Sequence, residues 1–295
     1  LDDALQRIRD RTGLDQFELI GMDACLMGHL EVYAALTPHA RYAVASQETE
    51  PALGWAYTGF LSALRDNPGM DGAQLGQLIV ESYIRTDQRI VDDEARAEFL
   101  SRGSPLAGLF SLPTAQQVAQ RMYDNVTLAT VDLQAMPQLM NSVNELSYAL
   151  QGANQSNVAK ARSYAQSFTS IFGQQVPPSY LDLGHLAQML KAEAGNRNVA
   201  GAADQVLAAL DQAVLAETHG RKKPAASGIS IYFPNSQLYQ SNYGGPDSYT
   251  TIANRFAAAS LWDDFLTYHY TGRSFDLDTG IIAVPDRDST VVGPG

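Results

Sequence analysis

The sequence predicts an α/β fold with a mostly parallel sheet and a helical insertion, and three observations carry this prediction. A strand–helix–strand order opens the chain, which is typical of a parallel βαβ unit. A long stretch with helical periodicity follows in the middle of the chain. A buried strand and a closing helix come near the end, so the helices interrupt a sheet rather than replace it.

The strand–helix–strand unit follows a predicted helix over residues 2–12. Apolar residues over 17–22 predict a short strand, residues 26–36 return to helical spacing, and 41–45 form a second apolar run of strand length. Further along, the pattern predicts strands over 127–131 and 228–233, and helices over 73–86, 134–151, 157–171, 182–194, 202–218 and 250–269.

Composition excludes some classes of partner. The 295 residues carry a formal net charge of −12, which argues against nucleic acid or an anionic membrane as the main partner. No run of eighteen apolar residues and no secretory signal is present. The chain begins at Leu1 rather than Met, so we expect it to be processed from a longer precursor.

The chain has a single cysteine, Cys25, which permits neither an intrachain disulfide nor a cysteine-based metal site. A free cysteine is most often a small buried hydrophobe. Cys25, however, follows the first strand, and Ser46-Gln47-Glu48 follows the second. Ligands of parallel sheets bind at the carboxyl ends of the strands. A helix beginning at residue 26 would also favour a thiolate, so the pattern predicts a nucleophile.

A general base for this thiol is not evident among the five histidines. His29 falls in the predicted helix, and three others are expected to be structural: His39, His185 and His269. His219, followed by Gly220, precedes the strand at 228–233 and is the one that could approach the sheet edge.

Several motifs, in this order and spacing, resemble the clostripain family of cysteine peptidases, a relative of caspases, gingipains, legumain and separase. The first is Ile20-Gly21-Met22-Asp23-Ala24-Cys25-Leu26-Met27. The others are Ser46-Gln47-Glu48-Thr49-Glu50-Pro51, Gly54-Trp55-Ala56-Tyr57, Thr130-Val131-Asp132-Leu133 and Gly228-Ile229-Ser230-Ile231-Tyr232-Phe233-Pro234. The likeness runs from about residue 5 to at least residue 270.

The resemblance implies a caspase-like α/β/α sandwich and a Cys/His dyad with Cys25 as nucleophile. The family's histidine lies in a His-Gly pair some forty to fifty residues upstream of the cysteine, whereas only 24 residues precede Cys25 here. The resemblance therefore implies the heavy chain of a zymogen that cleaves itself and retains a light chain carrying that pair. A secreted, periplasmic or cell-surface location is expected. The alternative is a truncated or catalytically incompetent pseudoprotease, or a regulatory binding module.

The expected organisation has four parts. Residues 1–133 form the nucleophile-bearing part of the caspase-like sheet domain and 134–220 a helical insertion or subdomain. Residues 221–272 form the closing strand and helix of the sheet domain, and 273–295 a C-terminal tail.

The resemblance also implies that Asp23 lines the pocket for the substrate residue before the scissile bond and prefers Arg or Lys in a peptide or protein. The alternative is that Asp23 caps the following helix. Basic-specific relatives often carry an acidic residue where this chain has Leu53. Glu48 or Glu50 would compensate, and the remaining predicted lining residues are Ser46, Gln47 and Trp55, with Tyr57 as a further aromatic wall. Some relatives depend on calcium, but the acidic clusters Asp92-Asp93-Glu94 and Asp263-Asp264 match no calcium loop and are expected to be solvated faces.

Overall fold

The structure, a computed structural model, describes residues 1–101, 113–173 and 175–277. The chain divides into two compact units. Unit 1 contains Leu1–His29, Pro38–Asp132 and Val214–Ser230, and unit 2 contains Leu30–Thr37, Leu133–Ala213 and Ile231–Gly295. No helix among the described residues is long and apolar enough to cross a membrane.

Unit 1 is built on a sheet of four strands in the order β1 (Phe17–Gly21), β2 (Ala40–Ala45), β3 (Thr127–Asp132) and β5 (Val214–His219). The pair β1–β2 is parallel, whereas β3 pairs antiparallel with both β2 and β5. Three of the four strands therefore run in one direction and only β3 is reversed. The predicted α/β class with a mostly parallel sheet is confirmed in this sense.

The central and edge strands differ in burial. In β2 every residue but Arg41 is buried, as expected for an apolar run inside a sheet. In β1 no residue is fully buried, although Phe17, Leu19 and Ile20 are apolar. Among the described strands β2 alone pairs with β1, so β1 is an edge strand of this sheet.

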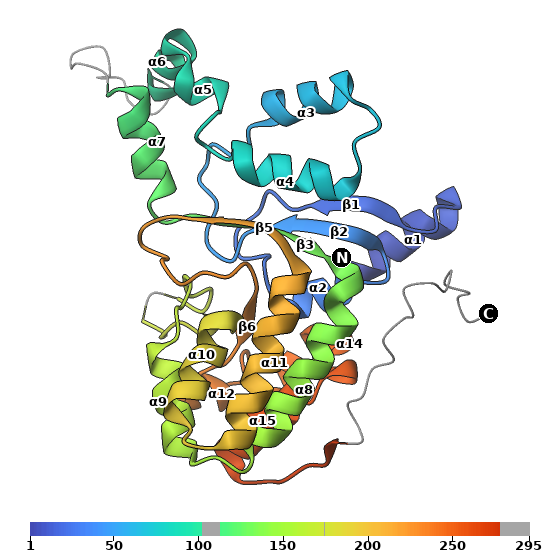
Figure 1. The fold of residues 1–295 in the computed structure, drawn as a ribbon, viewed down its shortest axis with the longest axis vertical. Coiled ribbons are helices and arrows are strands. Elements are labelled where there is room, and N and C mark those ends of the chain that lie inside the picture. The colour runs from blue at the N-terminus through green and yellow to red at the C-terminus, as the bar shows by residue number, and fades with distance from the viewer. Residues whose placement is uncertain (102–112, 174, 278–295) are drawn as a thin grey trace. The chain divides into compact units, whose positions relative to one another are not determined.

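Helix α4 (Gly72–Ser82) packs along all four strands, and Figure 1 shows it lying over β1 and β2. Its close approach depends on glycine. A Cβ on Gly76 would lie 2.5 Å from Cγ2 of Thr130, and one on Gly72 would lie 2.7 Å from the ring of Tyr42. Asp71 begins the helix with a reciprocal capping box that involves Gln74.

The remaining helices of unit 1 precede or follow α4. Their bounds are α1 (Asp2–Thr12), α3 (Tyr57–Asp66), α5 (Gln88–Val91), α6 (Asp93–Ser101) and α7 (Ala115–Tyr123). A hydrophobic core joins α4 to β2, β3 and α7 through residues that include Val44, Trp55, Ile79, Tyr83 and Leu128.

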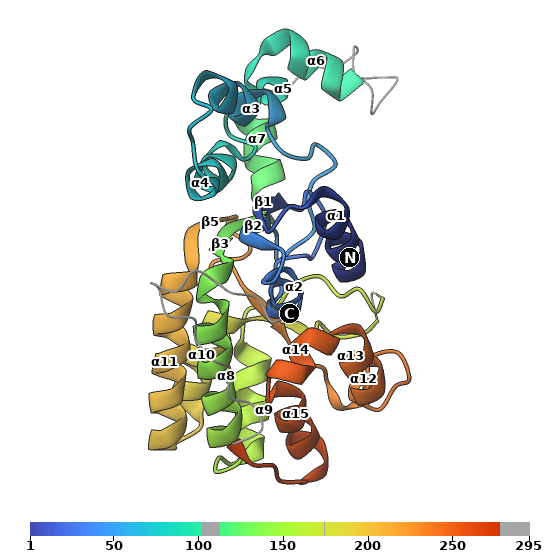
Figure 2. The ribbon, with the colours of Figure 1, turned by 90° about the vertical axis from the view of Figure 1, so that its right-hand side faces the viewer.

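Unit 2 is mainly helical. Helices α8 (Met136–Leu150), α9 (Gln155–Tyr164), α10 (Leu183–Glu193) and α11 (Arg197–Ala213) pack side by side, as Figure 2 shows. The helical segment expected from the sequence between the strands is thus present. Strand β4 (Tyr180–Asp182) pairs with β6 (Ser230–Tyr232) in a separate two-stranded sheet. The other elements of this unit are α2 (Leu30–Leu36), η2 (Leu133–Ala135), α12 (Ser236–Tyr239), α13 (Pro246–Ile252), α14 (Asn254–Ala259) and α15 (Trp262–Thr271).

Four predictions of local structure were wrong in part. The helix predicted over 202–218 ends at Ala213, because residues 214–219 pair with β3 as β5. The helix predicted over 157–171 ends at Tyr164, because Ser167 forms a bridge with Leu181. The single closing helix is three short helices, and the strand predicted over 228–233 pairs with β4 rather than with the main sheet. The four-part domain division stays a prediction, and most of the C-terminal tail, from residue 278, lies outside the described residues.

Candidate functional site

Cys25 is exposed and lies in a turn that follows β1. The predicted helix over 26–36 begins only at Leu30, so the helix-terminus argument for a thiolate was wrong. The chain cannot enter the helix earlier because it stays paired with the segment after β2. The N–H of Leu26 donates to the carbonyl of Glu48 over 3.0 Å, and that of Gly28 donates to the carbonyl of Ser46 over 2.7 Å.

Leu26, the residue after Cys25, has a left-handed backbone with φ of 58°. This region is uncommon for a residue with a branched side chain and costs about 1–2 kcal/mol. Such a conformation persists where the surrounding contacts determine it, and here the two hydrogen bonds from Leu26 and Gly28 do so. The turn therefore presents Cys25 to solvent in a defined position.

The segment that holds this turn is itself fixed by a buried ion pair. The carboxylate of Glu48 is fully buried and lies 2.6 Å from the ammonium of Lys223, whose side chain is 11% exposed. The other oxygen of Glu48 accepts from the N–H of Thr49 over 2.7 Å. Because these contacts satisfy a buried carboxylate, its segment cannot move without leaving a charge unpaired.

The side chains of Ser46 and Gln47 are buried in the same way. Ser46 Oγ donates to the carbonyl of Glu48 over 2.9 Å, and the Gln47 carboxamide accepts from the N–H of Gly228 over 3.1 Å. Thr127 Oγ1 accepts from the N–H groups of Gln47 and Glu48, both over 3.0 Å. The structure thus brings Ser46, Gln47 and Glu48 beside the nucleophile turn but uses their side chains for support. That these residues line the substrate pocket stays a prediction, and it now concerns their backbone groups.

Asp23 lies two residues before Cys25 and does not cap a helix, since α2 begins at Leu30. Its Oδ2 accepts from the N–H of Trp55 over 3.1 Å and from the Tyr57 hydroxyl over 3.0 Å. A Cβ on Gly54, whose φ is 67°, would lie 2.7 Å from the same oxygen. The Gly54-Trp55-Ala56-Tyr57 motif therefore forms a cradle for Oδ2, and Asp23 Oδ1 accepts no hydrogen bond from the described residues.

Glu50 contacts the thiol through its backbone. Its N–H donates to Cys25 Sγ over 3.3 Å, while its carboxylate accepts from the indole N–H of Trp55 over 3.3 Å and from the Tyr83 hydroxyl. Burial raises the pKa of Glu50 to about 7, and the negative charge of nearby Asp23 acts in the same direction. The hydrogen bonds from Tyr83 and Trp55 lower this pKa and offset part of the effect. Tyr83 was not anticipated from the sequence, because nothing there links a residue after α4 to the nucleophile turn.

The predicted aromatic wall divides into two roles. Trp55 is 3% exposed and lies in the core of unit 1, so it supports the two carboxylates through its N–H groups rather than offering its face to a ligand. Tyr57 is 46% exposed beside Asp23. Leu53 is 4% exposed and packs with Ile90 and Val118.

Two histidines of unit 1 have structural surroundings, as expected. His29 is buried, which lowers its pKa to about 3. His39 is buried and lies 2.6 Å from Asp2. His219 contacts Glu217 over 3.0 Å at the end of β5. Because β5 lies three strand positions from β1, the end of β5 is about 14 Å across the sheet from the end of the cysteine strand.

The histidines of unit 2 are also engaged within their own unit. His185 Nδ1 accepts from the N–H of Gln166 over 2.9 Å, and His269 Nδ1 lies 2.7 Å from Gln155 Oε1. Burial lowers the pKa of His269 to about 4. In the described part of the chain, residues other than Cys25 engage the side chains of His39, His185, His219 and His269.

The acidic clusters do not assemble a metal site. Among residues 1–101, 113–173 and 175–277, no three His, Cys, Asp or Glu side chains gather as ligands would. Residues 92–94 are exposed, as expected, whereas Asp263 is partly buried, which raises its pKa to about 6. Dependence on calcium stays a prediction from the resemblance.

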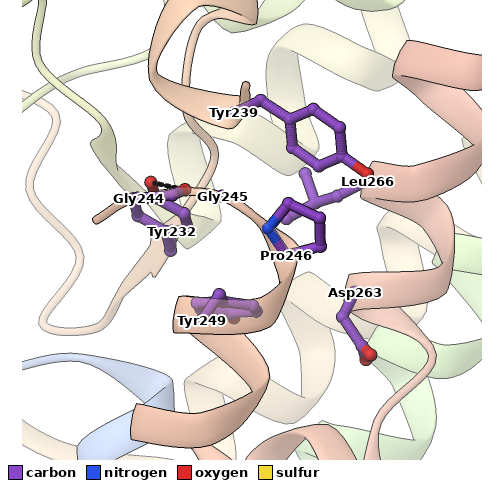
Figure 3. A pocket seen from close by; sticks show the side chains of 8 residues that line it. All are labelled: Tyr232, Tyr239, Gly244, Gly245, Pro246, Tyr249, Asp263 and Leu266. Atoms are coloured by element: carbon purple, nitrogen blue, oxygen red, sulfur yellow. Dashed lines mark hydrogen bonds between the residues drawn. The ribbon is translucent and has the colours of Figure 1, made fainter. Parts of the chain in front are cut away.

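Asp263 also lines a small cavity of about 10 Å³ in unit 2 (Figure 3). Its wall includes Tyr239, Pro246 and Tyr249, and the hydroxyl of Tyr232 donates to the carbonyl of Gly244 over 2.7 Å. A volume of this size holds no more than about one water molecule. It is not a site for a peptide side chain.

Comparison with known proteins agrees with the motifs around the thiol. The profile of Peptidase_C11, described as the clostripain family, matches residues 1–269. A search of curated proteins found no match.

Three solved structures with the same fold have 14–16% sequence identity to this chain. A clostripain of Bacteroides thetaiotaomicron in complex with the peptide inhibitor BTN-VLTK-AOMK is 16% identical, with a TM-score of 0.51 over 82% of this chain and 92% of that one. An inactive zymogen C11 protease of Parabacteroides distasonis is 14% identical, with a TM-score of 0.51 over 89% of this chain and 62% of that one. A secreted C11 cysteine protease of B. thetaiotaomicron, in complex with an irreversible peptide inhibitor, is 16% identical, with a TM-score of 0.52 over 87% and 61%.

Proposed function

Because this chain belongs to the clostripain family of cysteine peptidases, we propose that it is the heavy chain of a self-processed endopeptidase that cleaves peptides after Arg or Lys. Cys25 is the nucleophile, Asp23 recognises the basic side chain, and the general-base histidine lies outside these residues. A secreted, periplasmic or cell-surface location goes with this proposal, since one structural relative is a secreted protease.

One observation carries the assignment of Cys25. The only thiol of the chain is exposed in a turn after a parallel strand, and its neighbour Leu26 is held in a left-handed conformation by the segment that follows the adjacent strand. A structural cysteine is usually buried, and this one is not. The N–H of Glu50 donates to Sγ over 3.3 Å, so the thiol is held in a defined position beside that segment.

The position of β1 at the edge of its sheet supports the proposal that the general-base histidine comes from another segment. The strand is the edge of its sheet among the described residues, and its apolar residues Phe17, Leu19 and Ile20 are only partly buried. On the neighbouring α1, the apolar side chain of Ile8 is 45% exposed. An edge strand with unpaired N–H and carbonyl groups favours pairing with a further strand. We assign that place to the segment that carries the family's His-Gly pair.

The reaction follows from these groups. The Cys25 thiolate attacks the carbonyl carbon of the scissile bond, the histidine transfers a proton to the departing amine, and water then hydrolyses the acyl-thioester. Backbone N–H groups near Cys25 and from the His-Gly pair stabilise the negative oxygen of both tetrahedral intermediates. Asp23 contributes through Oδ1, which is free to accept from a guanidinium or ammonium while Oδ2 stays in its cradle.

Expression of the full-length precursor tests this proposal. Intact-mass measurement should find a second, co-purifying chain that contains a His-Gly pair, and the complex should hydrolyse peptides that end in Arg or Lys before the reporter group. Cys25→Ala should abolish hydrolysis. A complex with both chains present that cleaves no peptide would establish the alternative, a catalytically incompetent member of the family.

A further inference from the structure

We propose that Glu50 is a second specificity carboxylate of the site, which joins Asp23 in recognising a basic substrate side chain and releases a proton when that side chain binds. This inference rests on the proposed function, because it concerns the substrate residue next to the bond that Cys25 attacks. Leu53 contributes no charge to the site, since it is an apolar residue packed in the core.

The position of Glu50 relative to the thiol carries the inference. Its N–H contacts Cys25 Sγ over 3.3 Å, so its side chain begins beside the atom that attacks the substrate. The same tryptophan holds both carboxylates: the Trp55 backbone N–H donates to Asp23 and its indole N–H donates to Glu50. A side chain that reaches Asp23 from a carbonyl at Cys25 therefore has Glu50 as a close neighbour.

The groups that face Glu50 determine whether its carboxylate is protonated. Neutral donors surround it, namely the indole of Trp55 and the hydroxyl of Tyr83, and Asp23 adds negative charge. Tyr57 and Cys25 belong to the same cluster of interacting groups, which also contains the cation Arg89. Arg89 is itself bonded to Asp87 over 2.6 Å and to the carbonyl of Trp55 over 2.9 Å, so its charge is already engaged.

A buried carboxylate in these surroundings holds its proton to unusually high pH, and burial raises the pKa of Glu50 to about 7. A guanidinium or ammonium placed between Glu50 and Asp23 reverses this effect, because an opposite charge favours the ionised form. Binding of a basic residue near neutral pH is therefore coupled to loss of the Glu50 proton. Binding of an uncharged residue of the same shape is not.

The consequence is a preference for basic residues that increases with pH. We expect the ratio of kcat/KM for a peptide with Arg before the scissile bond to that for the same peptide with citrulline to rise about tenfold between pH 5.5 and 8. Titration of the Cys/His dyad affects both peptides equally and cancels in the ratio.

Glu50→Gln tests the inference, since the amide keeps a hydrogen-bond partner for Trp55 and Tyr83 but carries no charge. The expected result is an Arg/citrulline ratio that no longer changes with pH. Glu50→Asp should restore a pH-dependent ratio. Glu81→Gln makes the same chemical change at an exposed position of α4 and should behave as the wild type.

Tyr83→Phe is the second variant, and it does not alter the carboxylate itself. The Tyr83 hydroxyl stabilises ionised Glu50, so its removal should move the midpoint of the ratio to higher pH. Two results would overturn the role of Glu50 and leave the proposed peptidase activity standing. One is an Arg/citrulline ratio of the wild type that is constant with pH, and the other is a pH dependence of this ratio that persists in Glu50→Gln. Failure of the wild type to cleave either peptide would overturn the proposed function as well.

Discussion

The backbone N–H of Glu50 donates a hydrogen bond to the sulfur of Cys25 over 3.3 Å. This contact joins two segments that follow neighbouring strands, β1 and β2. Hydrogen bonds from Leu26 to Glu48 and from Gly28 to Ser46 join the same two segments. The thiol is therefore positioned by backbone groups of a segment whose own side chains are buried.

The buried ion pair between Lys223 and Glu48 should be essential for this arrangement. Lys223→Met leaves the fully buried Glu48 carboxylate without its 2.6 Å partner and should lower the free energy of unfolding by about 3–5 kcal/mol. Lys222→Met is the matched control, because Lys222 is exposed and should change stability by less than about 0.5 kcal/mol. Urea denaturation of both variants measures the difference. Equal midpoints would show that the ion pair does not fix this segment.

The approach of α4 to the sheet should depend on Gly76. Gly76→Ala places a Cβ 2.5 Å from Thr130 Cγ2 and should destabilise the protein by about 1–3 kcal/mol through overpacking. Gly59→Ala in α3 meets no atom within 4 Å, so it should stabilise the protein by about 0.5–1 kcal/mol through helix propensity. Thermal unfolding should show a lower Tm for Gly76→Ala and a higher Tm for Gly59→Ala than for the wild type. A higher Tm for Gly76→Ala would contradict the close packing of α4 on the sheet.

Removing the charge of Asp23 should reduce the preference for basic substrates. Asp23→Asn keeps an oxygen for the N–H of Trp55 and the Tyr57 hydroxyl, so the cradle is preserved. We expect kcat/KM for an Arg peptide to fall by about 10- to 200-fold relative to the citrulline peptide, which corresponds to about 1.5–3 kcal/mol. Asp15→Asn, at an exposed position, should leave the ratio unchanged. Equal turnover of both peptides by the wild type would remove the role assigned to Asp23.

The titration of Glu50 should also appear in the stability of the protein. Its pKa is raised from 4.5 in the unfolded chain to about 7 in the folded one, so the folded state binds more protons between these values. The contribution of Glu50 to stability is therefore fully present below pH 4.5 and is lost as pH rises through about 7. Glu50→Gln should remove this loss. Parallel Tm measurements from pH 5 to 8 would show a smaller decline for the variant, and identical slopes would contradict the assignment.

Much of the sheet and of the nucleophile turn was predictable from local sequence. The apolar runs that became β1, β2 and β3 are short and bounded by polar residues, and the helices at 2–12 and 73–86 have strong periodicity. Cys25 and Asp23 were identified by their place after a strand and by the family motif around them. The motif Gly54-Trp55-Ala56-Tyr57 was recognised, although its function as a cradle for Asp23 Oδ2 was not.

The remaining features depend on contacts between distant residues. Val214–His219 continues a helical pattern and becomes a strand only because β3 offers a partner. Glu48 was considered a candidate for the substrate pocket, but Lys223, 175 positions later, pairs with it in the interior. The burial of Trp55 and the link from Tyr83 to Glu50 likewise require the packing of α4 on the sheet. None of these pairings has a local signature in the sequence.

Covalent labelling of the assembled protein tests the central claim most directly. The two-chain complex from the full-length precursor should be incubated with a peptidyl-Arg acyloxymethyl ketone and the mass of each chain measured. We expect one adduct on the heavy chain, located at Cys25 by peptide mapping and absent from Cys25→Ala. An unmodified heavy chain, with the His-Gly chain bound and the protein folded, would contradict it.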